Sequence, residues 1–348
     1  MLMLDCQPTT VTFLLQARAM AMGSSRNLSS ADGTPLRADL YPVGAVGTQG
    51  PAGSREPLGA ASPAGSGPAE PAAPLNGRLD SGLGPSAPPR RGTVVVLHGY
   101  CEHRGRYRHV AEHLNRHGYQ VLVGDLRGHG ESGGERGFVR RFADYVDDTR
   151  ALLACAAKEL AEPGGPGSQA DMPILLGHSM GGLVALEFAL AYPDALKALA
   201  LSAPFLGLKI KVPSWKRGLG LVASVLRPTL RLPSGLQSAD LSHDPEVGRR
   251  YDADPLVTHD ATARWFTEVL AAHADVHARA GRVRVPTLMQ VAGDDRIVDA
   301  AVSQVVFDRL GASDKNLTVY PGLFHEIFNE LDQQRVLSDL TNWLNEHA

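Results

Sequence analysis

The stretch that decides the fold of this 348-residue chain is Ile174-Leu175-Leu176-Gly177-His178-Ser179-Met180-Gly181-Gly182. A short apolar run ends in the pattern G-x-S-x-G, and residues 183–192 follow it with a helical pattern. Strand, sharp turn and helix in this order form the context in which G-x-S-x-G makes a nucleophile elbow. The turn strains the serine backbone and lifts the hydroxyl clear of the sheet, so we expect Ser179 to be a nucleophile. A chance serine in a glycine-rich turn is the alternative, and the flanking strand and helix disfavour it.

Strands and helices alternate on both sides of this turn. Residues 93–97 are a run of mostly β-branched residues, which is typical of a strand buried on both faces. Such alternation predicts an α/β fold with a mostly parallel central sheet flanked by helices. We expect further strands at 120–123, 196–201, 287–291 and 317–320, and helices at 107–117, 138–160, 302–310 and 333–345.

Three segments depart from the alternation. Residues 1–27 lack the basic start of a signal peptide, so we read them as disordered, or as preceding a true start at Met20 or Met22. A single domain is expected over 28–348, opening with a hairpin at an Asp-Gly turn. Residues 43–91 are rich in Pro, Gly, Ala and Ser and predict a disordered insertion in that domain. Residues of about 205–280 predict a cap over the C-terminal edge of the sheet, where ligands bind in such folds.

The cap contains a string of apolar residues with two interpretations. They either dock transiently on a membrane or micelle, or pack against the body of the protein and line its pocket. The chain has no run of about 18 apolar residues, so we expect no membrane-spanning segment. The string consists of Leu219, Val222, Val225, Leu226 and Leu230.

A serine nucleophile needs a histidine to take its proton and a carboxylate to orient that histidine, in the chain order serine, acid, histidine. Of 13 histidines, only His325 and His347 follow the strand expected at 287–291, and His347 is next to the C-terminus. We therefore expect His325 to be the base. Asp295 is the expected acid, although spacing alone does not separate it from Asp294. Asp299 is better placed to cap the next helix.

An oxyanion hole needs two backbone N–H groups. One comes from the residue after the nucleophile, Met180, and we expect the other from Tyr100, in the loop after the strand at 93–97. His98 is expected to brace that loop by hydrogen bonding. Arg127 and His129 are expected to belong to a structural network.

Composition narrows the remaining classes of function. A net charge of −3 with 20% charged residues gives no electrostatic attraction to nucleic acid. Three scattered cysteines, Cys6, Cys101 and Cys155, suggest neither a disulfide framework nor a zinc site. The proposed chemistry needs no metal or organic cofactor. We expect a cytoplasmic protein, with peripheral membrane contact as the alternative, and the sequence specifies no oligomeric state.

Five stretches together carry a resemblance to a known family. With them the chain resembles the monoacylglycerol lipases, which are serine hydrolases of the α/β-hydrolase superfamily. The pattern H-G-x-x-E-H-x-x-R-Y in the first stretch is far more specific than G-x-S-x-G. The insertion before residue 93 departs from the family pattern. The stretches are His98–Tyr107, Arg127–Ser132, Gly177–Gly182, Tyr251–Leu256 and Gly293–Arg296.

The resemblance implies an α/β-hydrolase fold with a cap, and it gives Ser179, Asp295 and His325 the triad positions. It gives Tyr100 and Met180 the oxyanion positions. The implied reaction cleaves a monoacylglycerol to a fatty acid and glycerol through an acyl-enzyme. Alternatives are a lysophospholipase or general carboxylesterase, and a non-catalytic binding protein of the same fold. An epoxide hydrolase or dehalogenase would carry aspartate at the elbow.

Overall fold

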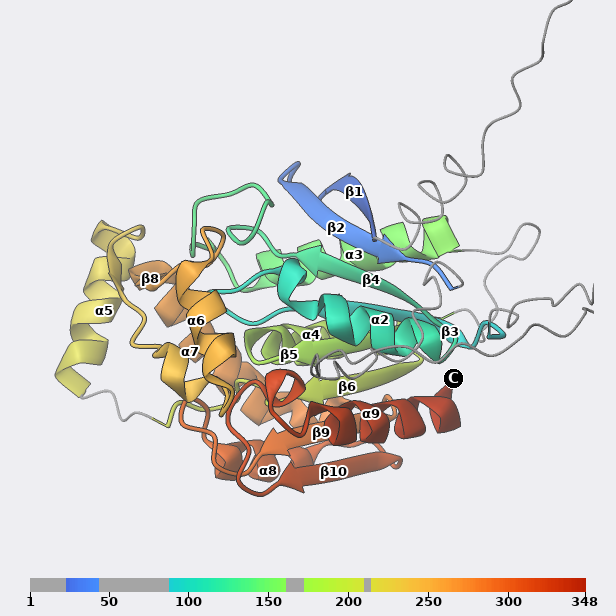
Figure 1. The fold of residues 1–348 in the computed structure, drawn as a ribbon. Coiled ribbons are helices and arrows are strands. Elements are labelled where there is room, and N and C mark those ends of the chain that lie inside the picture. Colours follow the sequence, from blue (N-terminus) through green and yellow to red (C-terminus); the bar gives the residue numbers. More distant parts are fainter. Residues whose placement is uncertain (1–22, 44–87, 161–171, 210–213) are drawn as a thin grey trace, which may run out of the picture.

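The described part of the chain, residues 23–43, 88–160, 172–209 and 214–348 of a computed structural model, is organised around an eight-stranded sheet (Figure 1). The strand order is β1-β2-β4-β3-β5-β6-β9-β10. The β1–β2 and β2–β4 pairs are antiparallel and the others are parallel. The strands are β1 (Ser24–Ser29), β2 (Pro35–Tyr41), β3 (Gly92–Leu97), β4 (Tyr119–Asp125), β5 (Ile174–His178), β6 (Ala198–Ser202), β9 (Thr287–Ala292) and β10 (Lys315–Tyr320).

Helices cover both faces of the sheet, which explains why its central strands carry apolar residues on both faces. Successive residues of a strand point to opposite faces. In β3, Val94 and Val96 join the core on one side, and Val95 and Leu97 join the core on the other. The first core is covered by α2 (Arg108–Arg116) and α9 (Gln333–His347), and the second by α3 (Ala143–Leu160), α4 (Met180–Ala191) and α8 (Ala300–Arg309) (Figure 1).

The helix expected from residue 138 begins five residues later, at Ala143. The side chain of Asp144 accepts a hydrogen bond from the backbone N–H of Arg141 at 3.2 Å. The backbone N–H of Asp144 donates to the carbonyl of Arg141 at 2.9 Å. Short acidic side chains that bond nearby backbone in this way favour turns and helix starts. Residues 138–142 are therefore an irregular segment, ending in a turn, that leads into the helix.

The first two strands form the expected hairpin. Its turn places Gly33 at φ 84°, a conformation that glycine adopts without strain, and Ser30 N–H donates to the carbonyl of Thr34 at 2.8 Å. β1 begins at Ser24, so the boundary expected after residue 27 was wrong, because residues 24–27 pair with β2. Most of the expected insertion (43–91) and residues 1–22 lie outside the described residues.

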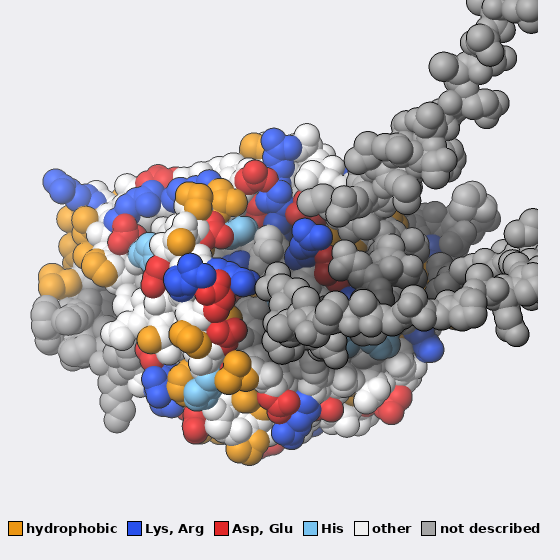
Figure 2. Space-filling model, in the orientation of Figure 1, with side chains coloured by type: hydrophobic (Ala, Val, Ile, Leu, Met, Phe, Trp, Pro, Cys, Tyr) orange, Lys and Arg blue, Asp and Glu red, His pale blue; other side chains and the backbone are white. Residues whose placement is uncertain are grey.

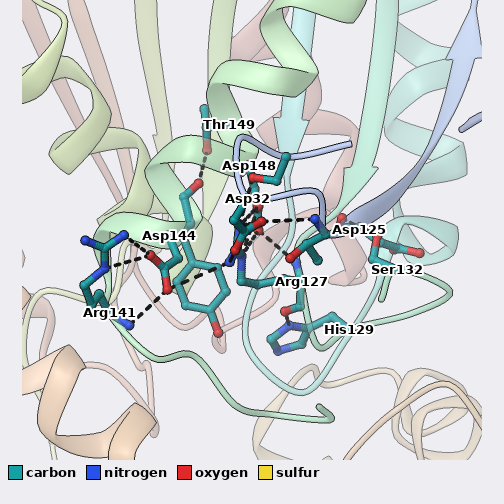
Figure 3. Close-up of polar contacts among 12 residues, drawn as sticks. Asp32, Asp125, Arg127, His129, Ser132, Arg141, Asp144, Asp148 and Thr149 are labelled. Carbon is teal, nitrogen blue, oxygen red and sulfur yellow. Dashed lines mark hydrogen bonds and ion pairs between the residues drawn. The ribbon is translucent and has the colours of Figure 1, made fainter. Parts of the chain in front are cut away.

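A buried arginine ties this hairpin to the rest of the domain (Figure 3). Arg127 pairs with Asp148 of α3 at 2.6 Å and with Asp32 of the hairpin turn at 2.7 Å. It also donates to the hydroxyl of Ser30 at 2.8 Å. The carboxylate of Asp148 is fully buried, so the arginine neutralises a charge that would otherwise be very costly to bury. This agrees with the structural role expected for Arg127.

The strand–helix alternation stops between β6 and β9, where the expected cap lies. The cap contains α5 (Ser214–Leu226), β7 (Arg231–Pro233), α6 (Pro245–Ala253), β8 (Asp260–Thr262) and α7 (Ala263–Arg279). In Figure 1 these elements lie beyond one end of the sheet. The last of them, α7, packs against α5 of the cap and against α4 of the main domain. Among the described residues, no helix is both long and apolar enough to cross a membrane.

Candidate active site

Ser179 occupies the turn between β5 and α4, as expected for a nucleophile elbow. Its φ of 52° and ψ of −118° are strained for a residue with a side chain. The residues two positions before and two positions after Ser179, Gly177 and Gly181, must be glycines because backbone crowds the turn. A Cβ on Gly177 would overlap the carbonyl of Gly181, and a Cβ on Gly181 would overlap the carbonyl of Leu97.

Three side chains from distant parts of the chain meet at this turn. The Oγ of Ser179 lies 2.9 Å from Nε2 of His325. The Nδ1 of His325 lies 2.7 Å from Oδ2 of Asp295. All three residues are buried, with at most 9% of their surface exposed. This arrangement can remove a proton from a serine hydroxyl and stabilise the resulting imidazolium.

The three candidate aspartates lie in and after the loop that follows β9, and each has different surroundings. Asp295 is buried, and its second oxygen accepts the backbone N–H groups of Ile297 and Val298, both at 2.8 Å. The side chain of Asp294 is exposed. Asp299 caps α8 by accepting the N–H of Ala301 at 3.0 Å. Only Asp295 of these three contacts the histidine.

The charges of the buried pair reinforce each other. Burial by itself opposes protonation of His325, but the charge of Asp295 and its hydrogen bond outweigh burial and raise the pKa of the imidazole above 6.5. Burial would raise the pKa of Asp295, and here the interaction with His325 lowers it. Nearby His178 behaves differently, because burial and the adjacent His325 lower its pKa to about 4. His178 is therefore neutral near pH 7, and of the two histidines it is His325 that takes up a proton.

The loop after β3 lies next to the serine. Among the described residues, neither the backbone N–H of Tyr100 nor that of Met180 donates to another protein group. Met180 is the first residue of α4, and the N–H groups in the first turn of a helix have no acceptor within the helix. His98 braces the loop as expected: Nδ1 contacts the Gly99 carbonyl at 2.7 Å, and Nε2 accepts the Leu126 N–H at 3.0 Å.

A buried ionic group, which the sequence analysis did not single out, connects this loop to the histidine loop. The carboxylate of Glu102 accepts the N–H of Gly99 at 2.6 Å. Arg106 lies 3.2 Å from that carboxylate and 2.5 Å from the carboxylate of Glu326, the residue after the histidine. The signal was present in the signature, where Glu102 and Arg106 are four residues apart. Nothing local indicated that Glu326 would join them.

A cavity of about 570 Å³ opens above Ser179 and His325. Glu102, Glu326 and Tyr251 supply polar groups to its wall, and most of the other lining residues are apolar side chains of the cap. They include Leu219, Ala223, Leu230, Trp265, Phe266 and Val269. An apolar cavity with a few polar groups near a nucleophile suits a ligand with one long apolar part and one small polar part.

The apolar string of the cap divides between the two expected roles. Leu219 and Leu230 line the cavity. Val225 and Leu226 do not, and both are 74% exposed. Figure 2 shows hydrophobic side chains gathered at the left of the molecule, over α5. Across the described ranges, no group of three or more His, Cys, Asp or Glu side chains is arranged to hold a metal ion.

Comparisons with known proteins agree with this geometry. Residues 88–332 match the hydrolase family described as serine aminopeptidase, S33. The chain belongs to this family. A monoacylglycerol lipase of Mycolicibacterium smegmatis is 37% identical over 259 residues, which are 74% of this chain and 89% of that protein. Phospholipase YtpA of Bacillus subtilis is 33% identical over 249 residues, which are 70% of this chain and 91% of that protein.

Solved structures give the same relationship. The crystal structure of a Paleococcus ferrophilus monoacylglycerol lipase matches with a TM-score of 0.67 at 32% identity, covering 75% of this chain and 96% of that chain. A Saccharomyces cerevisiae monoglyceride lipase shares the fold, with a TM-score of 0.69 at 19% identity over 94% of this chain and 96% of that chain. The expected α/β-hydrolase fold and the resemblance to monoacylglycerol lipases are therefore confirmed.

Proposed function

We propose that this protein hydrolyses monoacylglycerols to a fatty acid and glycerol, with Ser179, His325 and Asp295 as its catalytic triad. The observation that carries the proposal is the contact of these three side chains at the base of an apolar cavity. The names of two relatives that are at least 32% identical, both monoacylglycerol lipases, support the choice of substrate.

The reaction proceeds in two halves. His325 takes the proton of Ser179 as the serine oxygen attacks the ester carbonyl, and Asp295 stabilises the imidazolium. The N–H groups of Tyr100 and Met180 bind the tetrahedral oxyanion. His325 then passes its proton to the departing glycerol oxygen, which leaves the acyl group on the serine. A water molecule, deprotonated by His325, attacks the acyl-enzyme and releases the fatty acid.

The polar end of the cavity favours a neutral head group. Glu102 and Glu326 both line the cavity there, with Arg106 between them. One guanidinium serves both carboxylates, although burial raises the pKa of Glu326. The charge of Arg106 is therefore already matched, and a phosphate placed here would face carboxyl oxygens, whereas glycerol hydroxyls can donate to them. Phospholipid hydrolysis is the second candidate, because one relative is named a phospholipase, and the acidic lining makes it the weaker one.

The test compares neutral and phosphorylated substrates. Initial rates are measured on 1-monoacylglycerols of graded chain length and on lysophosphatidylglycerols of the same chains, whose head group carries a net negative charge, with Ser179→Ala as the blank. We expect a higher kcat/KM on every monoacylglycerol, and a gain with chain length of up to about four-fold per methylene from burial of apolar surface. Faster hydrolysis of the lysophospholipids would contradict the proposed substrate.

We further propose that α5 contacts the lipid surface from which the substrate comes. From residue 218 to residue 226 its exposed side chains are all apolar, and Leu219 is both 61% exposed and part of the cavity wall. An acyl chain can therefore pass from a bilayer to the cavity without crossing a polar surface. Flotation with phosphatidylcholine vesicles should recover less Val225→Glu and Leu226→Glu protein than wild type. Unchanged recovery of both variants would exclude this role for α5.

A further inference from the structure

One side chain of the cap touches both residues that carry the proposed oxyanion amides. Trp265 lies in the first turn of α7 and is 6% exposed. Its indole ring stacks on the phenol ring of Tyr100, with centroids 3.6 Å apart and an angle of 20° between the planes. The indole N–H points at Sδ of Met180, with 3.4 Å between nitrogen and sulfur. The tryptophan is therefore wedged between the two residues.

The start of α7 is fixed to the same region of the main domain. Thr262 caps the helix by accepting the N–H of Trp265 at 3.3 Å. The hydroxyl of Thr262 donates to the carbonyl of Gly137 at 2.9 Å, and the hydroxyl of Tyr100 donates to the same carbonyl at 2.8 Å. Residue 137 must be glycine here, since a Cβ would lie 2.7 Å from the tyrosine oxygen. One carbonyl thus sets the positions of both stacked rings.

We propose that Trp265 is a positioning residue for the oxyanion hole. The inference rests on the proposed ester hydrolysis. The stack fixes the side chain of Tyr100, and the N–H···S contact fixes that of Met180, so the indole sets the distance between the two backbone N–H groups. Stabilisation of an oxyanion depends on donors already placed where the charge develops. A shift of either donor therefore slows the reaction.

A positioning role differs measurably from that of a plain cavity wall, although Trp265 also lines the cavity. A wall residue contacts the acyl chain equally before and during the reaction, so its loss weakens all ligands alike. A residue that places the oxyanion donors acts on the transition state alone. Its loss should lower kcat and weaken transition-state analogues, while the binding of ground-state ligands changes little.

The test uses Trp265→Leu and Trp265→Phe and three measurements: kcat and KM on a monoacylglycerol, inhibition by an alkyl boronic acid, and inhibition by the fatty acid product. The boronic acid forms a bond from its boron to the oxygen of Ser179 as the serine proton passes to His325. The resulting tetrahedral anion places an oxygen in the hole. For Trp265→Leu we expect kcat/KM and boronic acid affinity to fall together by about 10- to 100-fold, with fatty acid inhibition near the wild-type value.

Two further variants separate the contacts. Trp265→Phe keeps a stacking ring but loses the N–H, so it should lose less activity than the leucine variant. Met180→Leu removes the sulfur acceptor while keeping the backbone amide. It should match Trp265→Phe, and the double variant should lose no more than either single one, because both remove the same contact. Additive losses would contradict a contact between the two side chains that matters for the reaction.

Trp343 gives a matched control in the same protein. It lies on α9, stacks on His347 at 4.0 Å, and donates its indole N–H to Asn316 at 3.0 Å. Trp343→Phe loses the same kinds of contact away from the cavity and should keep wild-type kinetics. Equal losses of boronic acid and fatty acid affinity in Trp265→Leu would overturn the inference, as would an equal loss of kcat in Trp343→Phe. A wild type no faster than Ser179→Ala would instead refute the proposed hydrolysis and remove the basis of the inference.

Discussion

Replacing Asp295 with asparagine tests the proposed triad with almost no change of shape. One oxygen of Asp295 accepts two backbone N–H groups, from Ile297 and Val298. An asparagine must keep its carbonyl oxygen there, because its amide NH₂ cannot accept those bonds. The NH₂ group is then directed at Nδ1 of His325, 2.7 Å away in the wild type.

This orientation reverses the histidine. Nδ1 of His325 has to accept the hydrogen bond, so the ring proton moves to Nε2, which faces the oxygen of Ser179. A protonated Nε2 cannot take the serine proton. In a serine protease, the same substitution with its change of tautomer lowers kcat about 10,000-fold, which corresponds to about 5 kcal/mol of barrier. We expect a loss of that size here.

The assay is monoacylglycerol hydrolysis at pH 8, with circular dichroism to show that the variant folds. Asp294→Asn is the control, because it makes the same chemical change on the exposed neighbouring side chain, and it should keep nearly full activity. If Asp295→Asn kept more than about a tenth of the wild-type kcat, or if Asp294→Asn lost as much, the proposed role of Asp295 would be wrong.

Two more predictions follow from buried charges. Glu326→Gln removes a negative charge that helps to raise the pKa of His325, and activity needs the neutral imidazole. The wild-type kcat/KM should therefore fall as the pH drops through a value above 6.5. In the variant this fall should occur at a lower pH. A fall at the same or a higher pH in the variant would contradict the prediction. Arg127→Met leaves the fully buried Asp148 without its partner and should lower the free energy of unfolding in urea by about 3–5 kcal/mol. Arg141→Met, whose side chain is 62% exposed, should leave it nearly unchanged because exposed ion pairs contribute little, and equal losses would refute the assignment.

The sequence predicted most of the fold because the strands and helices alternate strongly. Runs of mostly β-branched residues such as residues 93–97 identify strands covered on both faces, and these lie where they were expected. Boundaries were less certain, because they depend on local side-chain bonds. The hydrogen bonds of Asp144 set the start of α3 at Ala143, five residues later than the apolar pattern suggested, and pairing with β2 extends β1 back to Ser24.

The candidate site could be predicted as far as chain order and known motifs reach. The elbow motif and the order serine, acid, histidine pick out Ser179 and His325, and only the structure separates Asp295 from Asp294. Contacts between distant residues carry no such local signal. In the sequence, Trp265 is only a tryptophan in a helical pattern. Its contacts with the ring of Tyr100 and the sulfur of Met180 depend on how the cap packs on the sheet.

The position of Trp265 also makes the intrinsic fluorescence of the protein sensitive to ligands in the cavity. Trp265 lines the cavity beside the sulfur of Met180, while Trp343 lies on α9, which covers one face of the sheet, and is not part of the cavity wall. A ligand entering the cavity changes the surroundings of the first indole and leaves those of the second as they were. The chain has a third tryptophan, Trp215. Intrinsic fluorescence of a variant with Trp215→Phe and Trp343→Phe, which keeps Trp265 alone, can therefore follow the filling of the cavity in real time without any attached dye.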